Sequence, residues 1–255
     1  MKEGRAARRL EALERARSGF ITTVGHELRT PLAAMLGYTE LLREGDAGPL
    51  NTEQQALLAC VERNGARLSG LIDDLVKVAR VQSEAFALPM DKVELNSVVR
   101  RAVEVANCAR TARSIDLDLR LDATGPLTAG SSKELEEVVS QLLSNALTFT
   151  PAGGRVIVTT HHSESSCSIA VSDTGPGISA SEQEELFDYF FRASPPSHRP
   201  TPGVGVGLSL AKAIVRECGG DITVTSDRGQ GATFIVRLPL WTGADDQALV
   251  GAEAS

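Results

Sequence analysis

The octet at residues 25–32, GHELRTPL, contains a histidine whose neighbours suit phosphoryl chemistry. A neutral imidazole can attack phosphorus through one ring nitrogen while the other nitrogen carries the proton. Glu27 can hold that N–H group, and Thr30 falls one helical turn after His26, on the same face. Pro31 has no N–H to donate, so the helix should bend there. A lone helical histidine is more often a solvated or packing residue, so these neighbours decide the interpretation.

A second set of chemistry-bearing residues begins more than a hundred positions later. Asn145, on a predicted helix, presents an amide oxygen that could bind Mg²⁺ beside phosphates. Asp173 follows an apolar strand, and its carboxylate can accept a hydrogen bond from the exocyclic amine of adenine. Gly175 and Gly177 lack a Cβ and so let the backbone approach the base. Each feature also has a plainer interpretation, as an exposed helix asparagine or a tight turn.

Three alternate glycines, Gly203, Gly205 and Gly207, open directly into a predicted helix over 208–218. The N–H groups at such a helix start favour phosphate oxygens. No G-K-[ST] sequence follows the glycines and no strand leads into them, which excludes a P-loop and a dinucleotide-binding fingerprint. The preceding segment, 194–202, is rich in proline and serine and predicts a mobile flap over the site.

Two amphipathic helices should carry the histidine. Apolar residues recur at helical spacing from 8 to 42 and again from 57 to 78, with a break at 45–49. Such a pair buries only one face of each helix, whereas two copies would form a four-helix bundle with a better core. We therefore expect a homodimer through residues 1–87.

Beyond Pro89, which suits a domain boundary, alternation replaces helical spacing. The apolar positions 115, 117, 119 and 121 predict a half-buried strand. Further elements are expected as strands at 155–160, 166–172, 221–225 and 233–238 and helices at 132–149 and 208–218. The fold class is therefore α+β, with a helical hairpin followed by a two-layer α/β sandwich around one mostly antiparallel sheet.

Composition excludes several classes of protein. The chain has 33 acidic and 26 basic residues, a net charge of −7 and 4% aromatic residues, which disfavours nucleic-acid binding. Its apolar runs are too short to span a membrane, and residues 1–17 lack the apolar core of a signal peptide. The four cysteines are isolated, which predicts reduced packing residues in a cytoplasmic chain rather than disulfides or zinc ligands.

Taken in order, these segments resemble the sensor histidine kinase family of two-component systems, over nearly the whole chain. The nucleotide segments resemble the Bergerat-like ATPase sandwich of the GHKL type, shared with gyrases, Hsp90-type chaperones and mismatch-repair ATPases. The resemblance implies that His26 accepts phosphate, Glu27 is its base or orienting group, and Thr30 positions water to dephosphorylate a partner. It implies ATP-binding roles for Asn145, Asp173, Gly175, Gly177, Phe191, Arg192, Gly203, Gly205, Gly207, Leu208 and Thr233, with Asn145 also holding Mg²⁺.

Three departures from the family pattern bear on the reaction. Gly25 stands where serine is more usual, and Gln141 replaces the first asparagine of the motif that ends in Asn145. Thr148 stands where a lysine or arginine is common, and the lost cation could cost about 2–4 kcal/mol of transition-state stabilisation. Arg192 or Lys133 could supply that charge instead.

The resemblance predicts ATP-dependent autophosphorylation of His26 and transfer of the phosphoryl group to an aspartate of a separate response regulator. A phosphatase activity toward that regulator is also implied. The alternative is a catalytically weak, kinase-like dimer that acts mainly by docking or dephosphorylating the regulator. A plain ATPase or serine kinase would leave the histidine octet without a purpose and ranks lower.

The expected domains are a signalling helix at 1–19, a dimerisation and phosphoacceptor domain at 20–87, a catalytic ATP-binding domain at 88–241 and a loosely ordered tail at 242–255. The ATP-binding domain should swing on the linker near 86–92 to reach the histidine. The chain could be the cytosolic portion of a longer, membrane-bound kinase or a soluble kinase driven by another protein. Whether the histidine belongs to the same subunit or its partner stays open.

Overall fold

The structure, a computed structural model, describes residues 2–81, 88–192 and 205–241. The chain divides into two compact units, one made of residues 1–86 with 202–206 and the other of 87–201 with 207–255. The predicted flap at 194–202, Gly203, residues 86 and 87 of the predicted linker and the tail at 242–255 lie outside the described residues. Each unit is considered by itself below.

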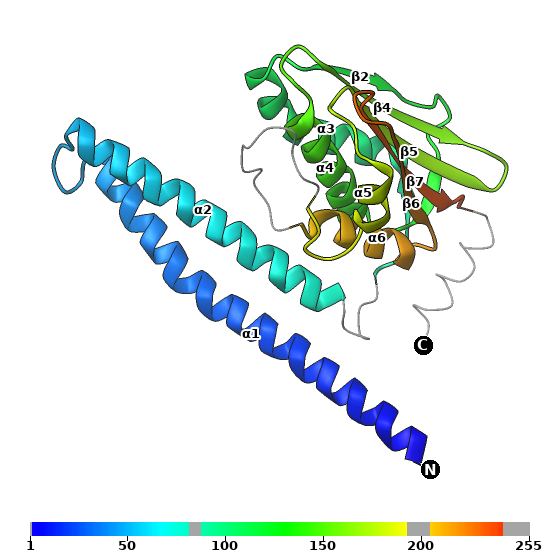
Figure 1. The fold of residues 1–255 in the computed structure, drawn as a ribbon, viewed down its shortest axis with the longest axis horizontal. Helices are drawn as coiled ribbons and strands as arrows, with labels where there is room; N and C mark the ends of the chain where they lie inside the picture. The colour runs from blue at the N-terminus through cyan, green and yellow to red at the C-terminus, as the bar shows by residue number, and fades with distance from the viewer. Residues whose placement is uncertain (1, 82–87, 193–204, 242–255) are drawn as a thin grey trace. The chain divides into compact units, whose positions relative to one another are not determined.

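The first unit is a helical hairpin of α1 (Lys2–Glu44) and α2 (Thr52–Val81), as predicted (Figure 1). Gly45 and Gly48 turn the chain between them with φ angles of +91° and +104°, which residues with a Cβ rarely adopt. Asn51 caps α2, because its Oδ1 accepts a hydrogen bond from the Gln54 N–H at 2.8 Å.

Glycines bring the two helices of the hairpin close together. A Cβ added at Gly25 would lie 2.2 Å from Cγ2 of Val76, and one at Gly65 would lie 2.5 Å from Cδ2 of Leu36. The buried apolar side chains of the hairpin include Leu32, Ile72, Val78 and Ala79. Many larger ones remain exposed, namely Leu28, Met35, Tyr38, Leu41, Leu42, Leu57, Val61, Leu68 and Leu75.

The second unit holds a five-stranded sheet in the order β2-β4-β5-β7-β6. Its strands are β2 (Asp116–Arg120), β4 (Arg155–His162), β5 (Ser166–Asp173), β6 (Asp221–Ser226) and β7 (Ala232–Pro239). Only β2 and β4 pair in parallel, so the prediction of a mostly antiparallel sheet is confirmed. A separate antiparallel pair, β1 (Asp91–Glu94) with β3 (Leu127–Gly130), was not predicted.

The helices of this unit are α3 (Leu95–Ala112), α4 (Ser132–Phe149), α5 (Ala180–Glu185) and α6 (Gly207–Glu217). The predicted helix at 132–149 matches α4, and the one at 208–218 is shifted by one residue from α6. We did not predict α3, although Val98, Val99 and Ala102 are fully buried along it at helical spacing.

One face of the sheet packs against α3, α4 and α6, which gives the predicted two layers (Figure 1). Burial alternates along the central strands, where Val156, Val158, Ile169 and Val171 are fully or almost fully buried. The prediction that residues 115, 117, 119 and 121 form a buried face was wrong beyond Ile115. Leu119 is 37% exposed, because β2 is an edge strand.

Candidate functional site

His26 lies exposed on α1, and its ring contacts a residue that we did not single out. Arg29, one turn later, places Nη1 3.3 Å from Nδ1 of His26. The same guanidinium donates from Nη2 to Oδ1 of Asp73 on α2, at 2.6 Å. Glu27 makes no hydrogen bond with the ring within the described part of the hairpin, so the predicted contact to the imidazole is not present in this conformation.

Thr30 and Pro31 occupy the turn that follows the histidine. The Thr30 hydroxyl donates to the backbone carbonyl of His26 at 3.4 Å, so it lies on the histidine's side of the helix as expected. The proline does not end the helix, because α1 continues to Glu44. The missing N–H of Pro31 nevertheless leaves the carbonyl of Glu27 without its usual helical donor.

In the second unit, α4 and the start of α6 meet at a glycine. A Cβ added at Gly207 would lie 2.2 Å from Cδ of Gln141, so the Gln141 amide rests directly against the first residue of α6. Its Nε2 donates to Oδ1 of Asn145 at 3.2 Å. The amide pair of α4 is therefore brought to the helix start that we predicted to bind phosphate.

The turn after β5 lies next to the end of α4. The N–H of Gly175 donates to Oδ1 of Asp173 at 2.7 Å, and a Cβ at Gly175 would lie 3.3 Å from the carbonyl oxygen of Phe149. Gly177 has a φ of +69°, and a Cβ there would lie 2.0 Å from the carbonyl oxygen of Asp227. The close approach of the Asp227 backbone thus requires glycine at 177, whereas a Cβ at Gly175 would first meet the Asp173 side chain, 2.6 Å from Oδ1.

Burial raises the pKa of Asp173 above its ordinary value, although hydrogen bonds from the Gly175 and Ala232 backbone oppose the shift. Among the described residues no ion pair to Asp173 is found, and a half-buried carboxylate binds a hydrogen-bond donor more strongly than one in water. Thr233 lies on the neighbouring strand, and its hydroxyl is 2.9 Å from that of Ser172. In the register of β5 and β7, Thr233 is paired with Ser172, and the residue paired with Asp173 is Ala232.

The segment 187–192 contacts α6 through a cation–π interaction. Nζ of Lys212 lies 4.5 Å from the ring centroid of Phe187. Phe191 is half-buried, and its N–H donates to the carbonyl of Asp188 at 3.3 Å. Arg192 is exposed and is the last residue described before the gap at 193–204.

Across that gap, Gly205 has a φ of +80°, and Leu208 is half-buried in the first turn of α6. Gly205 is grouped with the hairpin unit, whereas Gly207 and Leu208 belong to the sandwich.

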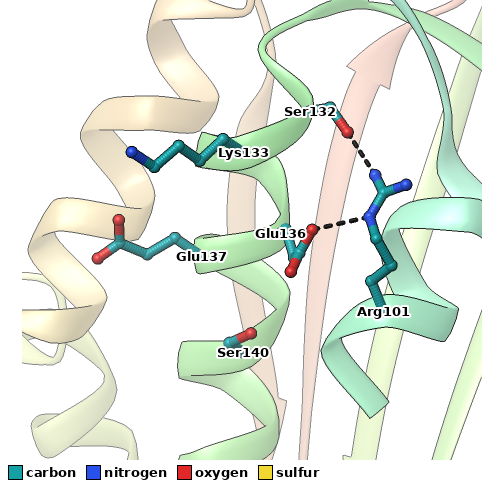
Figure 2. Close-up of a pocket in the computed structure, with 6 residues that line it drawn as sticks. All are labelled: Arg101, Ser132, Lys133, Glu136, Glu137 and Ser140. Carbon is teal, nitrogen blue, oxygen red and sulfur yellow. Dashed lines mark hydrogen bonds and ion pairs between the residues drawn. The ribbon is translucent and has the colours of Figure 1, made fainter. Parts of the chain in front are cut away.

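Lys133 does not lie near Asn145. It is in the first turn of α4, about 18 Å along the helix axis from Asn145 at 1.5 Å per residue. Figure 2 shows it beside a shallow hollow of about 500 Å³, where Arg101 of α3 pairs with Glu136 at 2.8 Å. Lys133 therefore cannot replace the cation that is missing at Thr148.

A different cation, which we did not predict, lies at the C-terminal end of α4, close to Thr148. Nη1 of Arg113 donates to the carbonyl of Leu147 and, at 2.7 Å, to the carbonyl of Thr148. The last turn of α4 has no basic residue of its own. Arg113 therefore binds the carbonyl end of the helix that carries Asn145, where positive charge is favoured.

The donor set suits Mg²⁺ rather than a metal held by the protein alone. Asn145 offers a single amide oxygen, and the described residues contain no group of three His, Cys, Asp or Glu side chains that could hold a metal ion. Mg²⁺ is commonly bound through one or two protein oxygens together with phosphates and water. The site therefore fits a magnesium–nucleotide complex.

Comparison with known families assigns both units. The His Kinase A (phospho-acceptor) domain matches residues 16–84, and the histidine kinase-, DNA gyrase B- and HSP90-like ATPase matches residues 130–242. This chain belongs to the histidine kinase family. The first match contains the exposed imidazole of His26, and the second contains the glycine turns around α4 and α6.

Known proteins similar to this histidine kinase include the sensor histidine kinase RppB of Synechocystis sp., 36% identical over 88% of this chain and 49% of RppB. The histidine protein kinase DivJ of Caulobacter vibrioides is 32% identical over 90% of this chain and 38% of DivJ. The chain thus spans about half, or less, of the length of these two relatives.

Solved structures agree with the fold of this histidine kinase. The crystal structure of full-length ShkA in complex with AMPPNP covers 88% of this chain and 46% of ShkA, with a TM-score of 0.75 and 25% identity. The mycobacterial sensor histidine kinase MprB covers 59% of this chain, with a TM-score of 0.52 and 27% identity. Within the described residues of this chain, every helix is too short or too polar to cross a membrane.

Proposed function

We propose that this histidine kinase uses ATP to phosphorylate its own His26 and then transfers the phosphoryl group to an aspartate of a separate response regulator. The observation that carries the proposal is the presence of two complementary sites in one chain. An exposed imidazole lies on the helical hairpin, and a glycine-bounded nucleotide site lies in the sandwich. The nucleotide site supplies the phosphoryl group and His26 accepts it, so autophosphorylation requires both sites.

In the nucleotide site, Asp173 accepts a hydrogen bond from the exocyclic amine of adenine, and the role of Thr233 on the next strand rests on the family pattern. Asn145 holds Mg²⁺, which neutralises charge on the phosphates when bound. The N–H groups at Gly207 and Leu208 favour phosphate oxygens, since they lie at the start of α6, and the role of Gly205, two residues before α6, rests on the family pattern. The roles of Gly203, Phe191 and Arg192, at the edges of the undescribed segment, rest on the family pattern alone.

The lone pair of His26 Nε2 forms a bond to the γ-phosphorus as the bond to the β–γ bridging oxygen breaks, and ADP leaves with that electron pair. The proton on Nδ1 stays on the ring or passes to Glu27. The sandwich must bring the γ-phosphate in line with Nε2, because the two sites are in separate units.

The hairpin is proposed to dimerise. Its exposed apolar side chains recur along both helices, with Met35 at 59% and Leu57 at 64% exposure. A hairpin with that much apolar surface in water gains stability by pairing with a second copy as a four-helix bundle. The regulator and the dimer partner are thus the two proteins that this chain should bind.

Incubation with γ-labelled ATP and Mg²⁺ tests the proposal. We expect a label that is stable in base and labile in acid on the wild type, and none on His26→Gln. His161→Gln is the matched control, because His161 is an exposed histidine of the sandwich. An unlabelled wild type, or a labelled His26→Gln protein, would refute autophosphorylation at His26.

A second candidate function is favoured by Gln141 and Thr148, which replace residues common in active kinases. In that case the dimer mainly dephosphorylates the regulator, with Thr30 positioning the attacking water. Adding the protein to a phosphorylated regulator distinguishes the two functions. Fast loss of label that is abolished by Thr30→Ala, together with weak labelling of His26, would favour the phosphatase.

A further inference from the structure

Arg29 links the histidine ring to the second helix of the hairpin. Its Nη2 lies 2.6 Å from Oδ1 of Asp73 on α2, and its Nη1 lies 3.3 Å from Nδ1 of His26 on α1. Arg29 and Asp73 are 40% and 44% exposed, so the pair is accessible to solvent. The guanidinium therefore bridges two helices and a ring nitrogen at once.

The direction of the hydrogen bond to the ring is fixed by chemistry. A guanidinium has only N–H donors, so Nδ1 of His26 must be the acceptor. In a neutral imidazole that accepts at Nδ1, the proton is on Nε2. Nδ1 is also the nitrogen bonded to Cγ and is closer to the helix, whereas Nε2 is the outer nitrogen that a bulky nucleotide can reach. The reachable nitrogen is thus protonated and has no lone pair.

We propose that Arg29 is a positioning residue that holds His26 in the tautomer unable to attack ATP, and that Asp73 holds Arg29 in place. This inference rests on the proposed function and adds a control step to it. Before transfer, Arg29 leaves Nδ1, water carries the proton from Nε2 to Nδ1, and the Nδ1–H group donates to Glu27. The Nε2 lone pair is then free to form the bond to phosphorus.

The control step responds to movement between the two helices. Arg29 is on α1 and Asp73 is on α2, 44 residues apart in the sequence. Helix displacements of about 1–2 Å are common in signalling and are enough to break a hydrogen bond of this length. An exposed ion pair contributes little to stability, so such a movement faces a low barrier. A signal that shifts α1 along α2 would therefore release the ring.

The tautomer can be measured directly by ¹⁵N NMR of the imidazole in the full chain without nucleotide, at about pH 9, where histidine is neutral. The variants are Arg29→Met, which removes the donors, Arg29→Lys, which keeps a cationic donor, and Asp73→Asn. The matched control is Arg43→Gln. Arg43 also pairs across the helices, with Glu62 at 3.7 Å, but lies about 25 Å along α1 from His26.

We expect Nε2–H to dominate in the wild type and its ratio to Nδ1–H to fall about two- to tenfold in Arg29→Met, the worth of one hydrogen bond. Arg29→Lys should recover part of the ratio, Asp73→Asn should lower it less, and Arg43→Gln should leave it unchanged. In a labelling assay, Asp73→Asn should raise the initial rate of His26 phosphorylation by a few fold, as the restraint weakens.

An unchanged ratio in Arg29→Met, or an equal change in Arg43→Gln, would overturn the inference. A rate that falls in Asp73→Asn while its circular dichroism melt matches the wild type would also overturn it. The NMR result needs no ATP, so it separates this inference from the proposed function. If no variant is ever labelled but the ratio responds to Arg29, the kinase proposal fails and the tautomer assignment stands.

Discussion

The hairpin and the sandwich solve the problem of burying apolar side chains in opposite ways. In the sandwich, Leu142, Val158 and Val236 are fully buried between one face of the sheet and its helices. Most of the large apolar side chains that are exposed in the described residues belong instead to α1 and α2. The sandwich is complete as a single chain, whereas the hairpin is not.

The difference matches what each region is proposed to do. A nucleotide site needs fixed distances among Gln141, Asn145 and Gly207, and a closely packed core supplies them. A phosphoacceptor that meets two partners in turn needs an exposed ring on helices that can shift. A hairpin with few buried side chains, paired with a second copy, would allow the ring to stay exposed and the helices to shift.

The largest effect is expected from a charge in the hairpin's exposed apolar surface. Met35→Asp places a carboxylate in the proposed dimer interface twice, and each buried charge costs on the order of several kcal/mol. Light scattering should show a monomer where the wild type is a dimer. Val105→Asp is the control, because Val105 of the sandwich is 74% exposed and should leave the mass unchanged. A dimeric Met35→Asp protein would contradict the proposed interface.

The next effect is expected in the core of the sandwich. Leu142→Ala removes a fully buried side chain of α4 and should lower the free energy of unfolding by about 2–5 kcal/mol. Urea titration followed by circular dichroism measures the change. Leu119→Ala, at the 37% exposed position on the edge strand, should cost less than about 1 kcal/mol. Equal effects at both positions would argue against the layer assignment.

Asp173→Asn should separate nucleotide binding from stability. Affinity for a fluorescent ATP analogue should fall roughly 10- to 100-fold, since a charged acceptor is lost. The raised pKa of Asp173 means that the folded state prefers the protonated form. The protonated Asp173 side chain therefore stabilises the fold in full below pH 3.8, the ordinary pKa of aspartate. This stabilisation is lost as the pH rises through the higher pKa of the folded state.

The nucleotide-free Asp173→Asn protein should therefore melt no lower than the wild type at neutral pH, because no charge is buried. Melting curves from about pH 4 to pH 8 test this. The wild type should lose stability as the pH rises over this range, and the variant should lose less. Lower stability of the variant at the higher pH would show that the carboxylate stabilises the empty site.

The smallest effect concerns the helix contact beside the histidine. Gly25→Ser would place a Cβ 2.2 Å from Cγ2 of Val76, so the hairpin should lose about 1–3 kcal/mol of stability. Val76→Ala in the same chain should restore part of it. Gly70→Ser is the control, because a Cβ at Gly70 has no neighbour within 4 Å among the described residues and should stabilise α2 slightly.

Local pattern was enough to predict much of the fold. Period-3.6 spacing placed both helices of the hairpin, and period-2 alternation placed β4, β5, β6 and β7 to within two residues of their ends. The pattern did not reveal α3. It also did not reveal β1 and β3, because strands of four residues are too short to show a clear alternation. It also overstated burial on β2, because alternation does not reveal which strand is at the edge of a sheet.

By itself, the sequence determined which residue types stand in which order: a histidine with an acid, a threonine and a proline, then an amide, an aspartate and the glycine turns. Only the tertiary structure decided which side chains meet across long separations. Arg29 reaches Asp73 over 44 residues, Arg113 reaches Leu147 over 34, and Gln141 rests against Gly207 of another helix. Such contacts depend on how packed elements are aligned against one another. Helix or strand periodicity indicates which face is buried but not which residue lies opposite.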